Sequence, residues 1–473
     1  MAATKVCTID QFYGIVQHRD GSLLGIGTAA DARNMDASDG NLSVAKGFEK
    51  KVEAQIPGTD RLVKLVVVLG EGEKYIAVGR EKVYFYDGAW REAHAFATAL
   101  ALDRVSAVQA KIGLEDYVIL CTGEGPMCKV KAVDGATAPF GSVEKGSGAP
   151  CNFICKYYGR VFAAGDPGNP NRLYWSAVPG DGRTVEHWLA VEGSPDASGG
   201  HTEIGDTNGD PITGLCALGN QIVIFKRYST WRLYGDRPSN YTVEQVDGMS
   251  HGMANSSVAV VADVPYWLTK NGVRYFNNTN IQAMDQENYL AGFLAGVKDV
   301  LHAKGACAGN KLYFTCRTGD GAADDAVIVF DLVRGTYMVR DGFAINDLAR
   351  FDDGLYFLND SRYVYQFERG DTYDGAPIRA YWKTQPTDLG ETYVEKQFKR
   401  LYMRCRGEKV VVSFRTGKKT DTTAKLIQED EVIEIPLFGD KCNNFDMTLA
   451  NENGSRFTVC GGVDITYERN QLA

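Results

Sequence analysis

The sequence predicts an all-β fold, a β-propeller followed by a small antiparallel β-sandwich-type domain, and three observations lead to this prediction. Gly is abundant at 52 of 473 residues while Pro is scarce at 14, which suits many tight turns with positive φ between short strands. The 24 Tyr and 21 Phe favour half-buried pleated surfaces. Most informative is a strand–turn–strand unit that recurs at a nearly constant interval, because such repeats identify whole architectures.

The repeat consists of an apolar run, a turn with Gly, Asn or Asp, and a second apolar run, which is typical of a β-hairpin. Seven copies begin at Glu73, Glu115, Tyr158, Gly219, Val264, Gly309 and Asp352, so successive starts lie 42, 43, 61, 45, 45 and 43 residues apart. One central hairpin per forty-odd residues is the spacing of four-stranded propeller blades. We therefore expect a propeller over residues 61–370, with seven blades ahead of six or eight. A sandwich of similar hairpins is the structural alternative, which the even spacing disfavours.

The flanking segments differ from the repeat. The long third interval includes residues 191–209, which are polar and rich in Gly and predict a surface loop. After residue 370 the runs are longer and alternate, so residues 371–473 predict a separate antiparallel β domain. Residues 1–60 are expected to form an N-terminal arm and opening strands.

Charge and composition limit the function classes. The net charge of −9 and the pI of about 5.4 argue against a general affinity for the nucleic acid backbone. Eleven cysteines are scattered without zinc-ligand spacing, which predicts reduced core thiols. The N-terminus lacks the pattern of a signal peptide, and no apolar run approaches the length of a membrane span. We expect a soluble protein made in a reducing cytoplasm.

No catalytic motif is present. None of the six histidines falls in an HxH or HExxH arrangement, and neither a GxSxG turn nor a phosphate-binding loop occurs. A triad assembled through space from several blades stays open. The sequence predicts neither an enzyme nor a cofactor.

A calcium site is a weak candidate in one loop. Asp206, Asn208 and Asp210 place oxygen atoms at alternate positions, but the glycine and the final glutamate of a complete calcium loop are missing. A plain Asx-rich turn is the favoured interpretation. The acidic turn at residues 320–325 is a weaker candidate, better explained as a solvated hairpin tip.

A basic stripe lies on the strand predicted from Lys399 to Arg406. Alternation places Arg400, Arg404 and Arg406 on one face and apolar residues on the other. The favoured interpretation is that the acidic run at residues 429–431 neutralises these arginines across strands. The alternative is an interface with another subunit or with DNA.

Several stretches resemble the β-propeller proteins of the tails of short-tailed bacteriophages, the tail-hub, nozzle or packaged-DNA stabilisation proteins. The matching stretches, in chain order, are ARNMDASDGNLSVAKGFEK (32–50), NPNRLYWSAVPGDGRTVEHW (169–188), PITGLCALGNQIVIFKRYSTWRLYG (211–235), HGMANSSVAVVADVPYWLTKNGVRYFNN (251–278) and YWKTQPTDLGETYVEKQFKRLYMRCRGEKVVVSF (381–414). Each motif is diffuse, and their common order is what makes the resemblance.

The resemblance implies a virion structural protein without an active site. The phage tail propeller proteins form homo-oligomeric rings, commonly of six subunits, around the channel through which DNA leaves the virion. The ring docks below the portal or its adaptor and contacts other tail proteins. We therefore expect assembly in the host cytoplasm, a place in the virion tail or neck, and passage of double-stranded DNA without sequence-specific binding. A glycan-binding or glycan-processing propeller, a lectin or glycosidase, is the alternative. An intracellular scaffold lacks support, because no blade-terminal Trp-Asp signature occurs.

Overall fold

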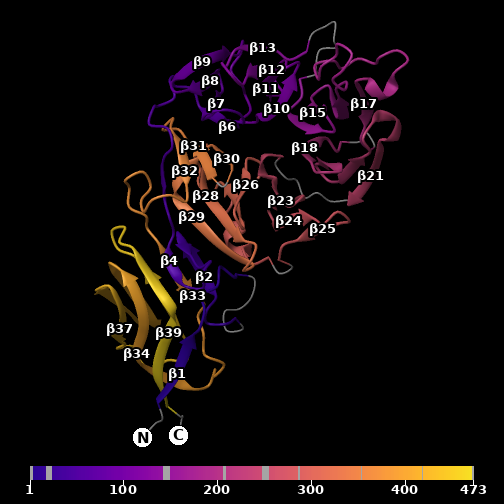
Figure 1. The fold of residues 1–473 in the computed structure, drawn as a ribbon. Helices are drawn as coiled ribbons and strands as arrows, with labels where there is room; N and C mark the ends of the chain where they lie inside the picture. Colours follow the sequence, from indigo (N-terminus) through magenta and orange to yellow (C-terminus); the bar gives the residue numbers. More distant parts are fainter. Residues whose placement is uncertain are drawn as a thin grey trace.

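The protein is a β-propeller joined to two larger sheets that contain both chain ends (Figure 1). The computed structural model describes residues 4–17, 24–141, 150–205, 209–247, 255–285, 288–352, 354–417 and 419–470. Within these residues, six sheets have four strands each, and a nine-stranded sheet begins with four strands of the same antiparallel kind. These sheets follow one another around a ring (Figure 1).

Each propeller sheet is a meander of neighbouring strands. The first three sheets contain β6 (Leu62–Val68), β7 (Lys74–Gly79), β8 (Lys82–Asp87) and β9 (Trp90–Ala95); β10 (Ser106–Ile112), β11 (Glu115–Cys121), β12 (Cys128–Lys131) and β13 (Thr137–Pro139); and β14 (Phe153–Tyr157), β15 (Arg160–Asp166), β16 (Asn169–Trp175) and β17 (Gly200–Glu203). The next contain β18 (Ile212–Ala217), β19 (Gln221–Lys226), β20 (Thr230–Tyr234) and β21 (Thr242–Asp247); β22 (Ala259–Val261), β23 (Val264–Thr269), β24 (Gly272–Phe276) and β25 (Ile281–Ala283); and β26 (Gly305–Ala308), β27 (Lys311–Cys316), β28 (Asp324–Asp331) and β29 (Thr336–Ile345). The last contains β30 (Asp347–Phe351), β31 (Gly354–Leu358), β32 (Val364–Phe367) and, from much earlier in the chain, β5 (Phe48–Lys50).

The seven predicted hairpins all form, as the second and third strands of these units. The second strands are almost continuously buried; every residue of β19, with the sequence QIVIFK, is buried. Fourth strands such as β9 and β17 have no fully buried residue, whereas β29, which continues into the larger sheet, is ten residues long and largely buried. A strand covered on both faces reads as an unbroken apolar run, which is why the hairpins were visible in the sequence.

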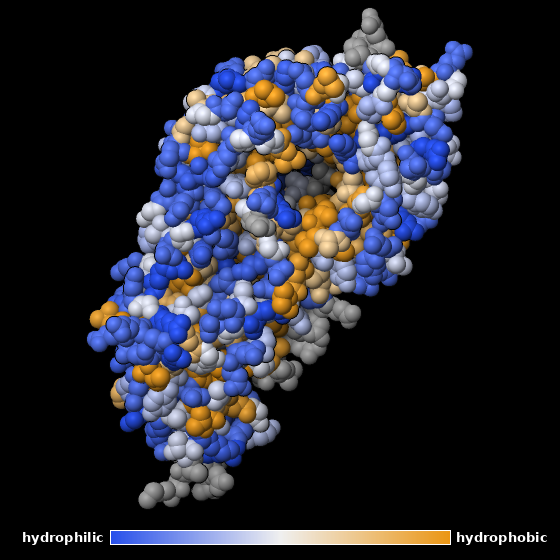
Figure 2. Space-filling model, in the orientation of Figure 1, coloured by the Kyte–Doolittle hydropathy of each residue, from blue (hydrophilic) through white to orange (hydrophobic). Residues whose placement is uncertain are grey.

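The first strand of each unit faces the axis of the ring. Neighbouring first strands contact one another from β30 through β6, β10 and β14 to β18, and from β22 through β26 back to β30. A short 3₁₀ turn, η5 (Asn255–Ser257), contacts both β18 and β26. Figure 2 shows that the surface is hollowed near the centre of the ring.

The ring is closed by a strand from near the N-terminus. β5 pairs antiparallel with β32, so that Phe48 lies opposite Phe367. The Phe48 ring contacts Phe357, Tyr365 and Tyr373 at centroid distances of 4.9, 5.1 and 5.0 Å. Because β5 directly precedes the first propeller sheet in the chain, this pairing fastens the two ends of the ring together.

The two larger sheets pack face to face. One has the order β3 (Met35–Asp36), β4 (Leu42–Val44), β39 (Phe457–Asn470), β34 (Glu395–Gly407) and β37 (Asp430–Pro436), with β1 (Thr4–Ile9) also paired to β39. The other continues the nine-stranded sheet beyond β29 through β2 (Ala29–Arg33), β33 (Tyr381–Thr384), β38 (Phe445–Ala450), β35 (Lys409–Thr416) and β36 (Lys419–Leu426). Phe398 of the first sheet contacts Phe414 and Phe445 of the second, at centroid distances of 5.2 and 4.5 Å.

The propeller and the larger sheets are joined through β29. This strand pairs with β28 on one side and meets β2 in parallel on the other, at Arg33 and Val339. One hydrophobic core cluster accordingly runs from the propeller, through residues such as Phe314, into the packed sheets around Trp382 and Leu449. The strands from residues 1–60 therefore belong to three places, namely the six-stranded sheet, the nine-stranded sheet and the closing propeller sheet.

Two local expectations were wrong. Residues 191–209 were predicted as a loop, yet residues 200–203 form β17 and complete a propeller sheet against β16. Asp324 was expected at a solvated hairpin tip, but its side chain is buried, because β28 begins there and extends further into the ring than the turn pattern indicated. None of the helices in the described part of the chain is long and apolar enough to cross a membrane.

Candidate functional site

The predicted basic stripe lies on β34, at the surface of the six-stranded sheet. Leu401, Met403 and Cys405 are buried, and the arginines between them are exposed, as the alternation predicted. β34 pairs with β37, which lies at the end of the sheet. The stripe therefore borders an open edge of the molecule.

The arginines of the stripe are paired within the sheet. Arg404 binds both oxygens of Asp430 through Nε and Nη2, each at 2.7 Å, and Arg406 Nε lies 2.8 Å from the same carboxylate. Arg400 pairs with Glu434 at 2.8 Å. Hydrogen bonds from the two arginines lower the pKa of Asp430 to about 2. These ion pairs agree with neutralisation of the arginines within the sheet, and Glu434 is a partner in addition to Asp430. A subunit contact by the same arginines stays a prediction.

The calcium candidate is only partly visible. Asp206 and Asn208 lie outside the described residues. Asp210 accepts hydrogen bonds from the Tyr228 backbone N–H at 2.7 Å and from the Ser229 hydroxyl at 2.5 Å, which holds the following turn. Within the described residues, no group of three or more His, Cys, Asp or Glu side chains is placed to hold a metal ion.

A cavity that the sequence analysis did not anticipate lies at one end of the propeller axis. Its volume is about 140 Å³, enough for several water molecules. Its polar lining comes from Lys64, Arg104, Ser106, Asn152, Thr213, Arg227, Ser256, Lys304 and Asp347. Apart from Arg227, which follows β19, these residues lie at or just before the first strands of successive sheets. All of the propeller units contribute to this wall, and we call it the mouth cavity.

The charge balance of the mouth cavity is positive. Four cationic side chains face one carboxylate, in a chain whose net charge is −9. The carboxylate, Asp347, is buried and accepts a hydrogen bond from the Leu65 backbone N–H at 2.8 Å. Lys64 Nζ lies 3.1 Å from it. Lys304, Arg104 and Arg227 form no ion pair among the described residues.

Lys304 is the most buried of these cations, with 6% of its surface exposed. The ammonium group has one hydrogen bond among the described residues, to the Ser256 hydroxyl at a long 3.4 Å. Burial lowers the pKa of Lys304, and Asp347 and Asp324 only partly offset this effect. Arg104 and Arg227 are exposed, and no side-chain partner of either is found in the described part of the chain.

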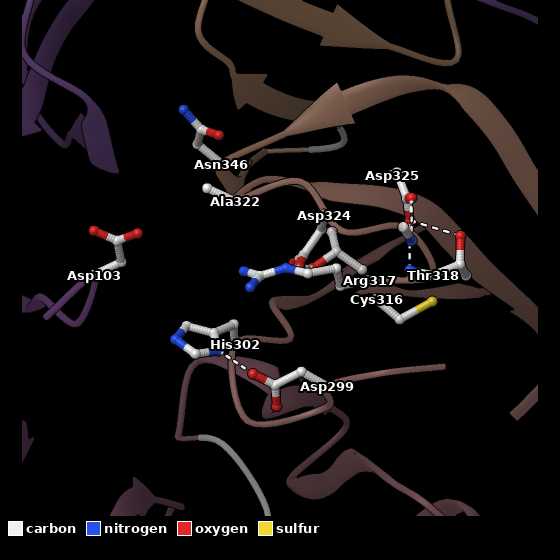
Figure 3. A network of polar contacts seen from close by, with 12 residues as sticks. Asp103, Asp299, His302, Cys316, Arg317, Thr318, Ala322, Asp324, Asp325 and Asn346 are labelled. Atoms are coloured by element: carbon white, nitrogen blue, oxygen red, sulfur yellow. Dashed lines mark hydrogen bonds and ion pairs between the residues drawn. The ribbon is translucent and has the colours of Figure 1, made fainter. Parts of the chain in front are cut away.

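A polar network borders the mouth cavity on the far side of Lys304. Figure 3 shows His302, Arg317 and Asp324 close together, with Asp103 facing them from the connection between β9 and β10. Asp324 accepts a hydrogen bond from the Thr315 hydroxyl at 2.5 Å, and burial raises its pKa. Asp103 forms ion pairs with Arg61 and Arg80, whose Nε atoms lie 3.1 and 2.7 Å from its two carboxylate oxygens. These two arginines outweigh the effect of burial and lower the pKa of Asp103.

His302 is the histidine with a carboxylate partner in this network. Its Nδ1 bonds to Asp299, three residues earlier (Figure 3). In the described residues, no Ser, Thr or Cys side chain forms a hydrogen bond with His302, so the pair lacks the nucleophile of a hydrolytic triad. The pair serves to hold the turn before β26, since Asp299 also accepts the Leu301 backbone N–H at 2.7 Å.

The mouth cavity was missed because its residues are far apart in the sequence. A signal does exist: a polar residue stands five to eleven positions before each predicted hairpin start, at Lys64, Arg104, Asn152, Thr213, Ser256, Lys304 and Asp347. That position is the entry to the first strand of each unit. Only closure of the ring brings these positions together.

Comparison with known proteins does not identify a family. No protein-family model matches the sequence, and no curated protein matches it. Among solved structures, the chain is similar to BamB from Moraxella catarrhalis, with 13% identity, a TM-score of 0.43, and coverage of 78% of this chain and 97% of that chain. It is also similar to virginiamycin B lyase from Staphylococcus aureus, with 11% identity, a TM-score of 0.45, and coverage of 67% and 98%.

A third similar structure is the WD40 domain of Pan2 from Neurospora crassa, with 11% identity, a TM-score of 0.42, and coverage of 71% of this chain and 98% of that chain. At these identities and TM-scores, no conclusion about activity, ligand or partner follows. The propeller architecture stands on the strand order and on the ring closure of this chain.

Proposed function

We propose that this chain is a structural subunit of a homo-oligomeric ring of six copies in the tail or neck of a bacteriophage virion. In this proposal the propeller has seven blades, and the packed sheets form a sandwich-type domain that contacts neighbouring subunits. The ring surrounds the DNA exit channel below the portal or its adaptor, helps retain packaged DNA and attaches other tail parts. The role is structural rather than catalytic.

The resemblance to phage tail propellers is one line of support. Its first stretch, residues 32–50, includes β3, β4 and β5, which connect the larger sheets to the closing propeller sheet. Its last stretch, residues 381–414, includes β33 and β34, one strand of each larger sheet. The other three stretches include propeller strands from β16 to β24, so the similar motifs are spread over both parts of the molecule.

The observation that favours assembly most is a pair of open sheet edges. β36 and β37 end their sheets, each with one neighbour in the described residues. Lys419, at the start of β36, donates to the backbone carbonyl of Phe438, just beyond β37, at 2.9 Å, so the two strands run along the same side of the molecule. Open edges are templates for pairing with another chain unless they are covered.

The same side exposes large apolar side chains. Leu426, Val432 and Phe438 are 73%, 66% and 71% exposed, and the arginine stripe on β34 lies next to them. Apolar contacts beside charged pairs are typical of subunit interfaces. If this edge binds a different surface of the next copy, the contact is head-to-tail. Such a contact repeats from copy to copy until the ring of subunits closes.

An acidic chain suits a DNA channel. With a net charge of −9, the subunit offers little of the counterion release that drives binding to the DNA backbone. Strong binding of phosphates along the channel would slow DNA movement. The proposal therefore includes passage of double-stranded DNA without sequence-specific binding.

The experiment is sedimentation velocity and negative-stain microscopy of the purified full chain and of L426K/V432K. The wild type is expected to form ring-shaped oligomers at high protein concentration. The double variant is expected to sediment as a monomer, because two buried ammonium groups at a subunit contact would be unpaired. A matched control is L114K, which alters a 98%-exposed leucine in the turn between β10 and β11 on the propeller and should assemble normally.

Two outcomes would contradict the proposal. A wild-type chain that stays monomeric at high concentration and is absent from virions would exclude the ring. Assembly of L426K/V432K at wild-type concentrations would show that this edge is not the subunit contact.

The glycan-binding alternative lacks a favouring observation at the mouth cavity. Glycoside hydrolysis commonly uses a pair of carboxylic acids that flank the scissile bond, whereas the mouth cavity contains four cations and one carboxylate. A glycan array with the purified chain distinguishes this alternative, since selective binding there would favour a lectin.

A further inference from the structure

We propose that the mouth cavity is a binding site for a phosphate-sized oxyanion, held by Lys304 together with Arg104, Arg227 and Lys64. This inference goes beyond the proposed function, because it concerns a single subunit and does not depend on ring formation. Its ligand class is a free phosphate or the terminal phosphate of a small molecule.

The first argument is the excess of cations around one cavity. Of the four cationic side chains in the lining, Lys64 is compensated by Asp347. The remaining three belong to three different units of the ring, since Arg104 precedes β10, Arg227 follows β19 and Lys304 precedes β26. A cleft with one sign of charge and low-dielectric walls concentrates ions of the opposite sign.

The second argument is the incomplete hydrogen bonding of the buried lysine. An ammonium group has three donors, and the one bond found for Lys304 in the described residues is the long contact with Ser256. A buried charge is costly unless it is paired. An anion in the cavity would supply the missing acceptors.

The third argument is a hydroxyl without a partner. The Thr213 Oγ1 atom is buried and has no hydrogen bond among the described residues, and its side chain lines the cavity. Buried hydroxyl groups are nearly always bonded. Thr213 belongs to the unit of β18, two units before that of Lys304, and a rotation about its Cα–Cβ bond would let this hydroxyl donate to an oxyanion in the cavity.

Size and geometry favour phosphate over larger anions. The cavity volume of about 140 Å³ accommodates a small ion with its bound waters but not a polymer backbone. The four cationic residues of the lining belong to four different units around the axis, which suits a tetrahedral group with several charged oxygen atoms. A planar monovalent carboxylate would compensate fewer of the cations and make fewer charge-assisted bonds.

The test is isothermal titration calorimetry of the full chain with inorganic phosphate at neutral pH and low salt. One saturable site per chain is expected. In R104A/R227A the affinity should fall about tenfold or more, because charge-assisted hydrogen bonds are lost. Both arginines are exposed, so this variant should fold like the wild type. K304M is the second variant, and its circular dichroism spectrum and melting temperature check folding.

The matched control is K270A/R369A, which removes one lysine and one arginine that are exposed elsewhere on the propeller. It tests whether the effect reflects overall charge, and its phosphate affinity should equal that of the wild type. Parallel titrations with glycerol phosphate and with acetate separate the sources of the oxyanion. Binding of both phosphates but not of acetate is the expected pattern, and tighter binding of glycerol phosphate would identify a phosphomonoester as the natural ligand.

Three results would overturn the proposal. These are the absence of saturable phosphate binding below about 10 mM, equal losses of affinity in R104A/R227A and K270A/R369A, and acetate binding as tight as that of phosphate. None of these results bears on ring assembly, so a failure here is distinguishable from a failure of the proposed function.

Discussion

Asn34 joins three parts of the chain through one side chain. It is 1% exposed and has a φ of 56°, in the left-handed region that Asn tolerates better than most residues. Its Nδ2 donates to Asp341 Oδ1 at 2.9 Å and to the Arg379 carbonyl at 2.7 Å. Its Oδ1 accepts from the Asp341 backbone N–H at 2.9 Å and from the Tyr373 hydroxyl at 2.8 Å. All hydrogen-bonding positions of this amide are therefore used.

Replacing Asn34 with Ala is expected to lower the free energy of unfolding by about 3–5 kcal/mol. The change leaves buried donors and acceptors without partners. It also places Ala, whose side chain forms no local hydrogen bonds, in the left-handed region. Urea denaturation followed by circular dichroism measures the difference. N280A, at an exposed turn position, is the control and should change stability by no more than about 0.5 kcal/mol. A loss in N34A as small as in N280A would show that the bonds of Asn34 contribute little.

Lys304 should give stability a characteristic pH dependence. Its pKa is lowered in the folded state by burial, so between that lowered value and the ordinary value the unfolded chain binds more protons than the folded chain. Stability then rises with pH across this window. Buried tyrosines such as Tyr75, whose pKa is raised by burial, act in the opposite direction, so the contribution of Lys304 must be isolated by difference.

The difference in the free energy of unfolding between wild type and K304M is the quantity to measure from pH 8 to pH 10. The wild type should gain stability relative to K304M as pH rises, because deprotonation removes the cost of burying a charged Lys304. K270M replaces an exposed lysine and should show no such trend. A K304M difference that stays constant with pH would mean that Lys304 is not desolvated in the folded protein.

At the scale of elements, ring closure depends on the short strand β5. Its pairing with β32 covers three residue pairs, and the aromatic cluster around Phe48 adds the packing that so short a ladder lacks. Phe48 is 5% exposed. The closing sheet is thus held mainly by one aromatic side chain and its neighbours.

F48A is expected to lower the free energy of unfolding by about 3–5 kcal/mol, the cost of truncating a buried Phe. Hydrogen exchange should report the loss first in β30, β31, β32 and β5, because these strands form the closing sheet. F351A, at an exposed position of β30, is a control for loss of an aromatic ring and should cost much less. Equal losses in the free energy of unfolding for F48A and F351A would show that the aromatic cluster around Phe48 contributes no more to stability than an exposed aromatic ring does.

The elements also differ in how far the sequence could predict them. The hairpins were predicted because their strands are continuous apolar runs around turn residues. First and fourth strands such as β22 and β13 are only three residues long, too short for a periodic signal. The pairing of β5 with β32 joins residues more than 300 positions apart, and no local pattern encodes such a partner.

The candidate sites show the same division. The alternation on β34 predicted which residues are exposed, because the face of a strand is a local property. The partner Glu434 was not predicted, since it depends on the register between β34 and β37. The mouth cavity could not be predicted at all, because Lys64 and Asp347 meet only when the ring closes.

For the whole molecule, the shared sheet predicts cooperative unfolding. Proteins with several domains often unfold in separate steps, but here β29 belongs to the propeller and borders β2 of the packed sheets. One core cluster extends across the junction. The two parts should therefore lose their structure together.

Differential scanning calorimetry of the monomeric protein is expected to show one transition, with equal calorimetric and van't Hoff enthalpies. L426K/V432K provides the monomer if the wild type assembles. In N34A, whose junction is weakened, the single peak should broaden or divide. Two resolved transitions in the parent protein would contradict the role of β29 as a shared element.

The closing position of β5 and the pairing of β1 with β39 also set the order in which the chain can fold during synthesis. β5 leaves the ribosome more than 300 residues before its partner β32, which at about 5–20 residues per second is a delay of roughly 15–60 s. β1 must wait still longer, because β39 ends at Asn470. During this time the early strands have no native partners, and unpaired strands are prone to aggregate. Chaperone binding to the first fifty residues of the nascent chain is therefore the expected requirement for a high yield of folded protein.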